Sequence, residues 1–105
     1  MTNMNEEEYE SLRQQLQVEM AQKQTFQLQY NEVKRTAEEV AKSNAGDELF
    51  EMTGQILIKR KKEDILNSLK EKEDILEYRL KSLTKSIDEK TKALQNAQQK
   101  LDKQK

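Results

Sequence analysis

The sequence predicts a mainly α-helical fold, in which two long helices pair antiparallel as a coiled coil and are joined by a short β-hairpin. Charged residues make up 37% of the chain, and Ala, Glu, Lys, Leu and Arg account for roughly half of it, which is typical of coiled coils. Apolar residues recur at alternating steps of three and four. This pattern disfavours disorder, and it changes only in residues 47–62, DELFEMTGQILIKRKK.

The first helix is expected over residues 5–44. Asn5 is a suitable N-cap, and Glu8, three residues on, can complete a capping box. Gly46 is expected to end the helix in the left-handed conformation. One stripe with the 3-4 spacing of a coiled coil then follows the helix: Tyr9, Leu12, Leu16, Glu19, Lys23, Phe26, Tyr30, Val33, Ala37 and Val40.

Polar residues interrupt this stripe, and some apolar residues lie outside it. Glu19 and Lys23 are the two polar stripe positions. The apolar residues off the stripe are either ordinary surface residues or a second contact face, and the pattern leaves both readings open: Val18, Met20 and Leu28.

A β-hairpin is expected over residues 48–60, because β-branched and aromatic residues lie on both sides of Gly54. If Thr53-Gly54 is a two-residue turn, Phe50 faces Leu57 and Glu48 faces Lys59. Side chains alternate between the faces of a strand, so one face carries Phe50, Met52 and Leu57 and the other Leu49, Ile56 and Ile58. An isolated hairpin is marginal in water. One that is apolar on both faces is therefore expected to be covered by another subunit.

Four basic residues, 59–62 (KRKK), end the hairpin. Such a run is found in patches that bind nucleic acid or acidic partners. It also occurs as a solvated strand end whose charges discourage aggregation through the strand edge. The run is short, and Glu63 and Asp64 follow it directly. We therefore favour the solvated strand end.

The second helix is expected over residues 62–102. Its stripe again has strict 3-4 spacing: Leu66, Leu69, Glu73, Leu76, Leu80, Leu83, Ile87, Lys90, Leu94, Ala97 and Leu101. When the chain folds back at the hairpin, the two stripes come into register, with Val40 beside Leu66 and Leu12 beside Leu94. The alternative is a single helical rod that dimerises in parallel, but it would leave the apolar hairpin as an uncovered interruption.

Composition also restricts function. The chain contains no cysteine and no histidine, so thiolate chemistry, disulfides and the commonest zinc ligand and general base are missing. We find no phosphate-binding loop and no nucleophile–base pair, and we expect no enzyme, cofactor or metal site. A net charge of −1 gives no basic field for nucleic acid, and no apolar run approaches a membrane span. We expect one domain over residues 1–105 of a cytoplasmic protein.

Apolar residues also gather at the helix ends farthest from the hairpin in the sequence. They either close the coiled coil or remain accessible for binding, and the pattern favours neither. Unbranched methionine suits contacts with varied partners. These apolar residues at the helix ends include Met4, Tyr9, Leu12, Leu16, Met20, Leu94 and Leu101.

Residues 49–69, LFEMTGQILIKRKKEDILNSL, resemble the β-type subunits of the prefoldin family. The likeness consists of an aromatic-containing strand, a glycine turn, an aliphatic strand ending in lysine and a charged helix start. Phe50, Gly54 and Lys59 occupy three of these places. Gln55 departs from the family pattern, where a small residue or proline is common. A single hairpin resembles the β type, since α-type subunits carry two.

The resemblance implies a hexamer of α-type and β-type subunits whose hairpins form a β-barrel platform. Coiled coils extend from this platform, and their tips hold unfolded clients and deliver them to a group II chaperonin without ATP. The resemblance thus makes the seven apolar residues named above at the helix ends the candidates for binding unfolded polypeptide. The residues expected to assemble the subunits are Leu49, Phe50, Met52, Gly54, Ile56, Leu57 and Ile58. The alternative is a structural coiled-coil adaptor with one fixed protein partner.

Overall fold

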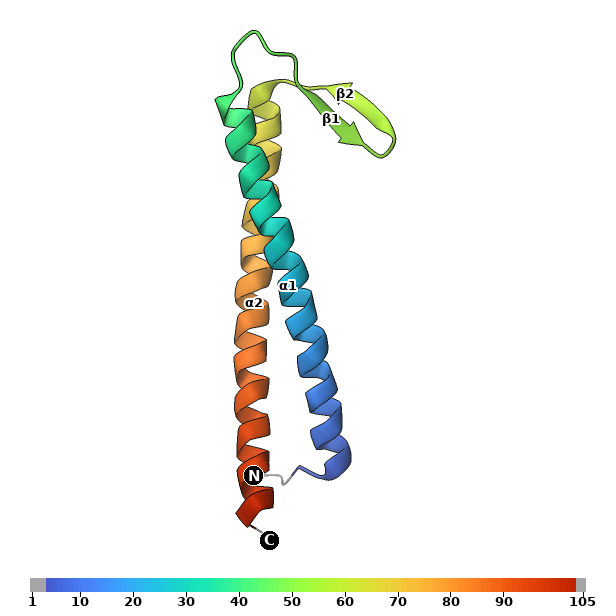
Figure 1. Cartoon of the computed structure of the whole chain (residues 1–105), viewed down its shortest axis with the longest axis vertical. Helices are drawn as coiled ribbons and strands as arrows, with labels where there is room; N and C mark the ends of the chain where they lie inside the picture. Colours follow the sequence, from blue (N-terminus) through green and yellow to red (C-terminus); the bar gives the residue numbers. More distant parts are fainter. Residues whose placement is uncertain (1–3, 104–105) are drawn as a thin grey trace. The chain divides into compact units, whose positions relative to one another are not determined.

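The computed structural model describes the backbone of residues 4–103 and the side chains of residues 4–100. Helix α1 (Glu6–Lys42) is followed by strands β1 (Phe50–Thr53) and β2 (Ile56–Lys59) and by helix α2 (Lys62–Lys103) (Figure 1). The predicted fold class, two long helices joined by an antiparallel two-stranded hairpin, is confirmed. Neither helix, over these described residues, is apolar enough along its length to cross a membrane.

The chain divides into two compact units, each containing part of both helices. Met1–Phe26 and Arg79–Lys105 form the terminal unit, and Gln27–Tyr78 forms the hairpin unit. In the terminal unit, the Tyr9 hydroxyl donates to Oε1 of Gln98 at 3.0 Å, and the Arg79 guanidinium lies 5.5 Å from the centre of the Phe26 ring. The start of α1 therefore meets the end of α2, as antiparallel pairing requires.

The start of α1 has the expected N-cap. The backbone N–H of Glu8 donates to Asn5 Oδ1 at 2.8 Å, which satisfies one of the free donors at the helix start. The Glu8 carboxylate accepts from the Asn5 side-chain amide at 3.1 Å. The capping box therefore closes through the Asn5 side chain rather than through its backbone N–H.

Burial follows the two predicted stripes. Within α1, the half-buried residues are the ten stripe positions and no others. The described stripe positions of α2 are all half-buried or buried, and Leu76 and Leu94, at 8% and 9% exposure, are the most shielded of them. Ile65 lies off the stripe and is equally buried, at 9%. A pair of helices has room for a narrow apolar seam and little more.

The hairpin forms, but the predicted turn and register are wrong. Phe50 pairs with Lys59 and Met52 with Leu57, so the turn residues are Gly54 and Gln55. Gly54 has φ +61°, and no non-glycine residue among those described has positive φ. Positive φ at the first turn position alone is the pattern of a type II′ turn. A type I′ turn at the predicted Thr53-Gly54 position would have forced Thr53, which is β-branched, into the left-handed region.

The end of α1 also differs from expectation. Gly46 does not adopt the left-handed conformation, since Gly54 is the only described residue with positive φ. Instead, the Ser43 hydroxyl donates to the carbonyl of Val40 at 2.6 Å, and the Ser43 N–H donates to the same carbonyl at 3.1 Å. The side chain and the backbone of Ser43 thus both donate to the Val40 carbonyl, one of the carbonyls left free at the end of α1 that a glycine cap would otherwise have satisfied.

Candidate functional site: an exposed apolar hairpin

The hairpin presents apolar side chains on both of its faces. Directly paired residues share a face, so Phe50, Met52 and Leu57 lie on one face, and Ile56 and Ile58 lie on the other. The register differs from the predicted one by two residues. Because side chains alternate with a period of two, this shift leaves the membership of each face unchanged.

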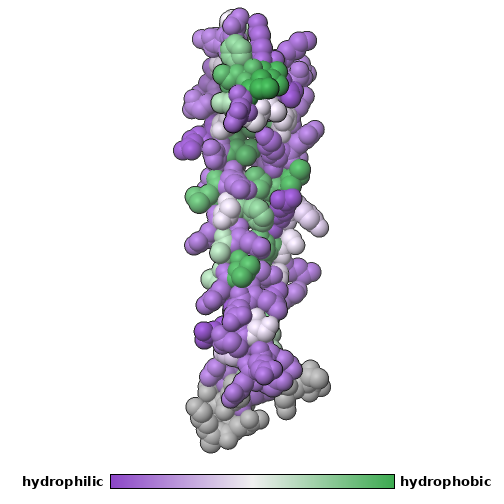
Figure 2. Space-filling model, turned by 90° about the vertical axis from the view of Figure 1, so that its right-hand side faces the viewer, coloured by the Kyte–Doolittle hydropathy of each residue, from purple (hydrophilic) through white to green (hydrophobic). Residues whose placement is uncertain are grey.

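These side chains are strongly exposed. Phe50, Met52, Ile56 and Leu57 are 53–65% exposed, and Ile58 is 43% exposed. Figure 2 shows the concentration of hydrophobic surface at the hairpin, bordered by hydrophilic side chains. In Figure 1 the strands extend away from the helix ends to which they connect, so neither helix covers them. Contiguous exposed apolar residues mark an interaction surface or an aggregation hazard.

Ion pairs between the strand ends border this surface. Lys59 Nζ lies 3.3 Å from Glu48 Oε1, and Arg60 Nε lies 2.9 Å from Glu51 Oε2. The Lys59–Glu48 pair is two-thirds exposed, and such pairs contribute little stability. The Arg60 N–H also donates to the carbonyl of Leu49 at 3.0 Å, which continues the pairing by one residue. Glu51 pairs directly with Ile58 within the strands, and its carboxylate is bonded to Arg60 at the base of the hairpin.

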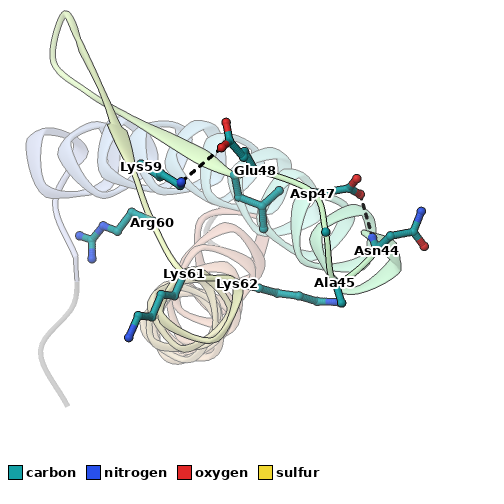
Figure 3. Close-up of a pocket in the computed structure, with 10 residues that line it drawn as sticks. Asn44, Ala45, Asp47, Glu48, Lys59, Arg60, Lys61 and Lys62 are labelled. Carbon is teal, nitrogen blue, oxygen red and sulfur yellow. Dashed lines mark hydrogen bonds and ion pairs between the residues drawn. The ribbon is translucent and has the colours of Figure 1, made fainter.

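The loop before β1 is held by Lys62 at the start of α2. Lys62 Nζ donates to the carbonyls of Ala41 and Ser43 at 3.0 and 2.9 Å. A cation is favourable at this end of α1, where the helix dipole is negative. The backbone N–H of Asn44 donates to Asp47 Oδ2 at 2.8 Å and tightens the same loop. Figure 3 shows Lys62 extending along the loop, beside an open hollow of about 690 Å³.

Three members of the basic run have partners within the chain: Lys59, Arg60 and Lys62. Lys61 is exposed and points away from the loop (Figure 3). The interpretation of the run as a solvated strand end stays a prediction.

The residues predicted to bind unfolded polypeptide lie in the terminal unit and differ in burial. Met4, Tyr9, Leu12 and Leu16 are half-buried, Leu94 is buried, and Met20 is 52% exposed. The side chain of Leu101 lies outside those the structure describes. Four of these residues are stripe positions and lie along the seam between the helices: Tyr9, Leu12, Leu16 and Leu94. Met20 lies off the seam.

The family model described as "Prefoldin subunit" (Prefoldin_2) matches residues 3–105. The chain belongs to the prefoldin family. It is 39% identical to the prefoldin subunit beta of Thermococcus onnurineus over 88 residues, which is 81% of this chain and 76% of that protein. It is 40% identical to the prefoldin subunit beta of Pyrococcus furiosus over 88 residues, 81% of this chain and 75% of that protein.

Solved structures agree with this assignment. The crystal structure of the prefoldin beta subunit from Thermococcus strain KS-1 superposes with a TM-score of 0.82, at 27% identity over 95% of this chain and 93% of that one. The beta2 subunit of the same strain has the same fold, with a TM-score of 0.75 at 14% identity. The predicted resemblance to β-type prefoldin subunits is confirmed. Prefoldin subunits are chaperone components rather than enzymes, and they assemble with other prefoldin subunits.

One feature of the terminal unit of this prefoldin chain was missed by pattern reasoning. Glu19 and Lys90, read separately as polar breaks in two stripes, lie 2.9 Å apart from Oε1 to Nζ. The Ser86 hydroxyl approaches the two oxygens of Glu19 at 2.7 and 3.0 Å, and Lys90 Nζ donates to Ser86 Oγ at 2.8 Å. The hydrogen bonds from Lys90 and Ser86 lower the pKa of Glu19. The predicted register places Glu19 beside Ile87 and Lys90 beside Leu16, so the pairing of Glu19 with Lys90 could be seen only in the folded structure.

Possible metal ligands and the hollow beside the loop are the remaining features of the described part of this prefoldin chain. The described residues contain no group of three or more acidic, histidine or cysteine side chains placed to hold an ion. The hollow beside the loop is lined by residues already bonded to one another, as Figure 3 shows for Lys59 with Glu48 and for Asn44 with Asp47. What the surface can offer a partner is therefore the apolar hairpin and the helix seam.

Proposed function

We propose that this chain is a subunit of a hexameric, cytoplasmic prefoldin that holds unfolded polypeptide without ATP and delivers it to a group II chaperonin. The observation that carries the proposal is the hairpin, whose two exposed apolar faces need partner subunits. At about 25 cal/mol per Å² of apolar surface removed from water, covering five such side chains is a substantial drive for assembly. Pairing with other hairpins would also remove the exposed strand edges.

Assembly through the hairpin is tested by native mass spectrometry of the tagged full chain isolated with its partner subunits. Phe50→Asp places a charge on the apolar face and is expected to abolish the hexamer. Ile75→Asp is the matched control, because Ile75 on α2 has the same 53% exposure as Phe50. A hexamer that survives F50D, or is lost equally with I75D, would contradict assembly through the hairpin.

We place client binding at the free ends of the helices. Tyr9, Leu12 and Leu16 form a half-buried apolar row next to Leu94, and Met4 adds a flexible apolar side chain at the start. A seam only two helices wide leaves such side chains partly open to water. They can therefore contact an unfolded chain at little cost in rearrangement.

Client binding is tested by the ability of the assembled complex to suppress light scattering from an unrelated heat-denatured protein. Deleting about ten residues from each end should remove this activity while native mass shows an intact hexamer. Tyr78→Ser is the control, since Tyr78 is 74% exposed but lies in the hairpin unit. Full activity after the deletions would contradict binding at the helix ends.

The native mass also separates this proposal from the structural adaptor. Six small helical chains, with at least one that carries two hairpin segments, are expected for a prefoldin. Co-purification of a group II chaperonin with the hexamer is the corresponding test of delivery. A single large partner of unrelated sequence, with no effect on the aggregation of denatured proteins, would instead support an adaptor.

A further inference from the structure

The apolar stripe of α1 is interrupted at two consecutive positions within the terminal unit. Leu16 and Phe26 are apolar, but Glu19 and Lys23 stand between them. All four are half-buried, so the polar pair occupies seam positions rather than the outer surface. On α2, Ser86 and Lys90 lie on either side of the stripe residue Ile87, and both bond to Glu19. The seam is therefore divided by a polar layer, which we define as Glu19, Ser86 and Lys90.

The polar layer is bonded but partly sheltered from water. The side chains of Glu19 and Lys90 are only 20% and 22% exposed. Shielded ion pairs lose hydration when they form, and apolar residues of similar volume at the same place are commonly as stabilising or more so. Polar residues at a seam position of a coiled coil likewise lower stability while they specify register. The seam is thus weakest where the layer crosses it.

The layer also favours one register. A shift of one heptad would place Glu19 against Ala93 and Ala97 in one direction, or against Arg79 and Leu83 in the other. The first shift leaves the carboxylate without a donor. The second replaces its bonds to Lys90 and Ser86 with Arg79 alone, and takes Arg79 from its place against the Phe26 ring. Apolar residues of the strictly repeating stripes tolerate such shifts, because one leucine or alanine replaces another. Helices that separate near their free ends can therefore close again correctly only when the layer re-forms.

We propose that the polar layer is a boundary at which the helix ends separate. Residues 4–18 of α1 open away from residues 91–103 of α2, while Phe26 and Arg79, on the other side of the layer, stay in contact. Re-formation of the Glu19–Lys90 and Glu19–Ser86 bonds restores the register when the ends close. The consequence for activity rests on the proposed function: the opened ends would present Tyr9, Leu12 and Leu16 to an unfolded chain.

The test is amide hydrogen exchange of the full chain in its assembly, comparing the natural protein with an E19L/K90L double variant. Leucine at both positions removes the ion pair without leaving either of its members unpaired, and Lys23 is the same in both proteins. We expect exchange in residues 6–18 and 91–100 to slow by about tenfold. Unchanged or faster exchange in these segments would show that the layer holds the ends together, and would overturn the proposal.

Glu73→Leu is the matched control. Glu73 is a half-buried polar stripe position of α2, but it belongs to the hairpin unit. The same kind of substitution there should leave exchange in residues 6–18 unchanged. Equal slowing by E73L would mean that any apolar replacement stabilises the whole chain, which would also overturn the boundary. Glu19→Gln provides a second variant of nearly natural size, and we expect it to speed exchange of the two end segments.

Register is tested by engineered crosslinks, which is straightforward because the chain has no cysteine. Cysteines at positions 12 and 94 report the natural register, and cysteines at 12 and 87 report a shift of one heptad. With the natural layer, only the first pair should form a disulfide efficiently. In the E19L/K90L background, the second pair should also crosslink, and its failure to do so would contradict the role in register.

The client-holding assay separates this inference from the proposed function. If E19L/K90L slows exchange at the helix ends and also lowers suppression of aggregation, both are supported. If exchange slows but client holding is unchanged, the boundary stands and binding at the ends fails. If exchange does not slow, the boundary fails, whatever the client assay gives.

Discussion

The apolar side chains of the hairpin lie on the surface, whereas those of the terminal unit lie along a seam between two helices. Phe50 and Leu57 are 53% and 61% exposed, while Leu94 is 9% exposed. Both regions consist of regular, strongly predicted elements. They differ because two helices can cover each other's stripes, but a two-stranded hairpin has two faces and no second layer. The apolar faces of the hairpin are therefore left uncovered within the chain, whereas the stripes of the terminal unit cover each other.

The largest effect on stability should come from the buried leucines. Leu76→Ala in the hairpin unit and Leu94→Ala in the terminal unit should each lower the free energy of unfolding by about 2–3 kcal/mol, measured by urea denaturation. Leu28→Ala is the control, because Leu28 is 71% exposed, and it should change stability by less than about 0.5 kcal/mol. A loss at Leu28 as large as at Leu94 would contradict a seam confined to the stripe.

Substitutions of the two glycines test whether the turn geometry determines the stability of the hairpin. Gly54→Ala places a side chain at φ +61°, and should cost about 1–2 kcal/mol and speed amide exchange in residues 50–59. Gly46→Ala should cost nothing measurable, since Gly46 has open space around it and no left-handed backbone. Equal effects of G54A and G46A would show that the turn geometry does not determine hairpin stability.

The cap of α1 tests how far the terminal unit depends on local bonds. Asn5→Ala removes the acceptor for the Glu8 N–H and should cost about 1 kcal/mol, seen as lower helicity and faster exchange in the first turns of α1. Asn67→Ala lies inside α2 and is exposed, so a neutral or slightly stabilising effect is expected there. Unchanged exchange in N5A would mean that packing alone holds the helix start.

The smallest effect on the free energy of unfolding is expected from the ionisation of Glu19 in the polar layer, which makes this contribution depend on pH. Hydrogen bonds from Lys90 and Ser86 lower the pKa of Glu19, so its ionised form stabilises the folded state. This contribution is complete above the ordinary pKa of glutamate and is lost as the pH falls through the lowered pKa. The difference in unfolding free energy between the natural protein and E19Q should therefore shrink on acidification. A difference that stays constant on acidification would contradict a stabilising role of the ionised Glu19 carboxylate.

Local sequence patterns were sufficient to predict much of the fold and part of the candidate site. The 3-4 spacing predicted all ten half-buried positions of α1, because a helix paired with one partner buries a single stripe. Alternation along the strands predicted which side chains share a face of the hairpin, since a register error of two residues preserves the faces. The motif in residues 49–69 was also enough to indicate the family.

Contacts between residues that are distant in the sequence could be identified only in the folded structure. Whether Gly54 takes the first or second turn position depends on the strain that Thr53 would bear, and spacing does not express this. Lys62 caps α1 across some twenty residues, in place of the local glycine cap that the sequence suggested.

The sequence by itself determined two amphipathic helices, a hairpin apolar on both faces and membership of the prefoldin family, because these follow from short-range periodicity and a local motif. Only the tertiary structure decided that Glu19 meets Lys90 and Ser86, that Ile65 is buried and that Lys62 closes the loop. Each of these depends on how two elements far apart in the chain lie against each other. Side-chain geometry at such contacts is set by packing, which periodicity alone does not encode.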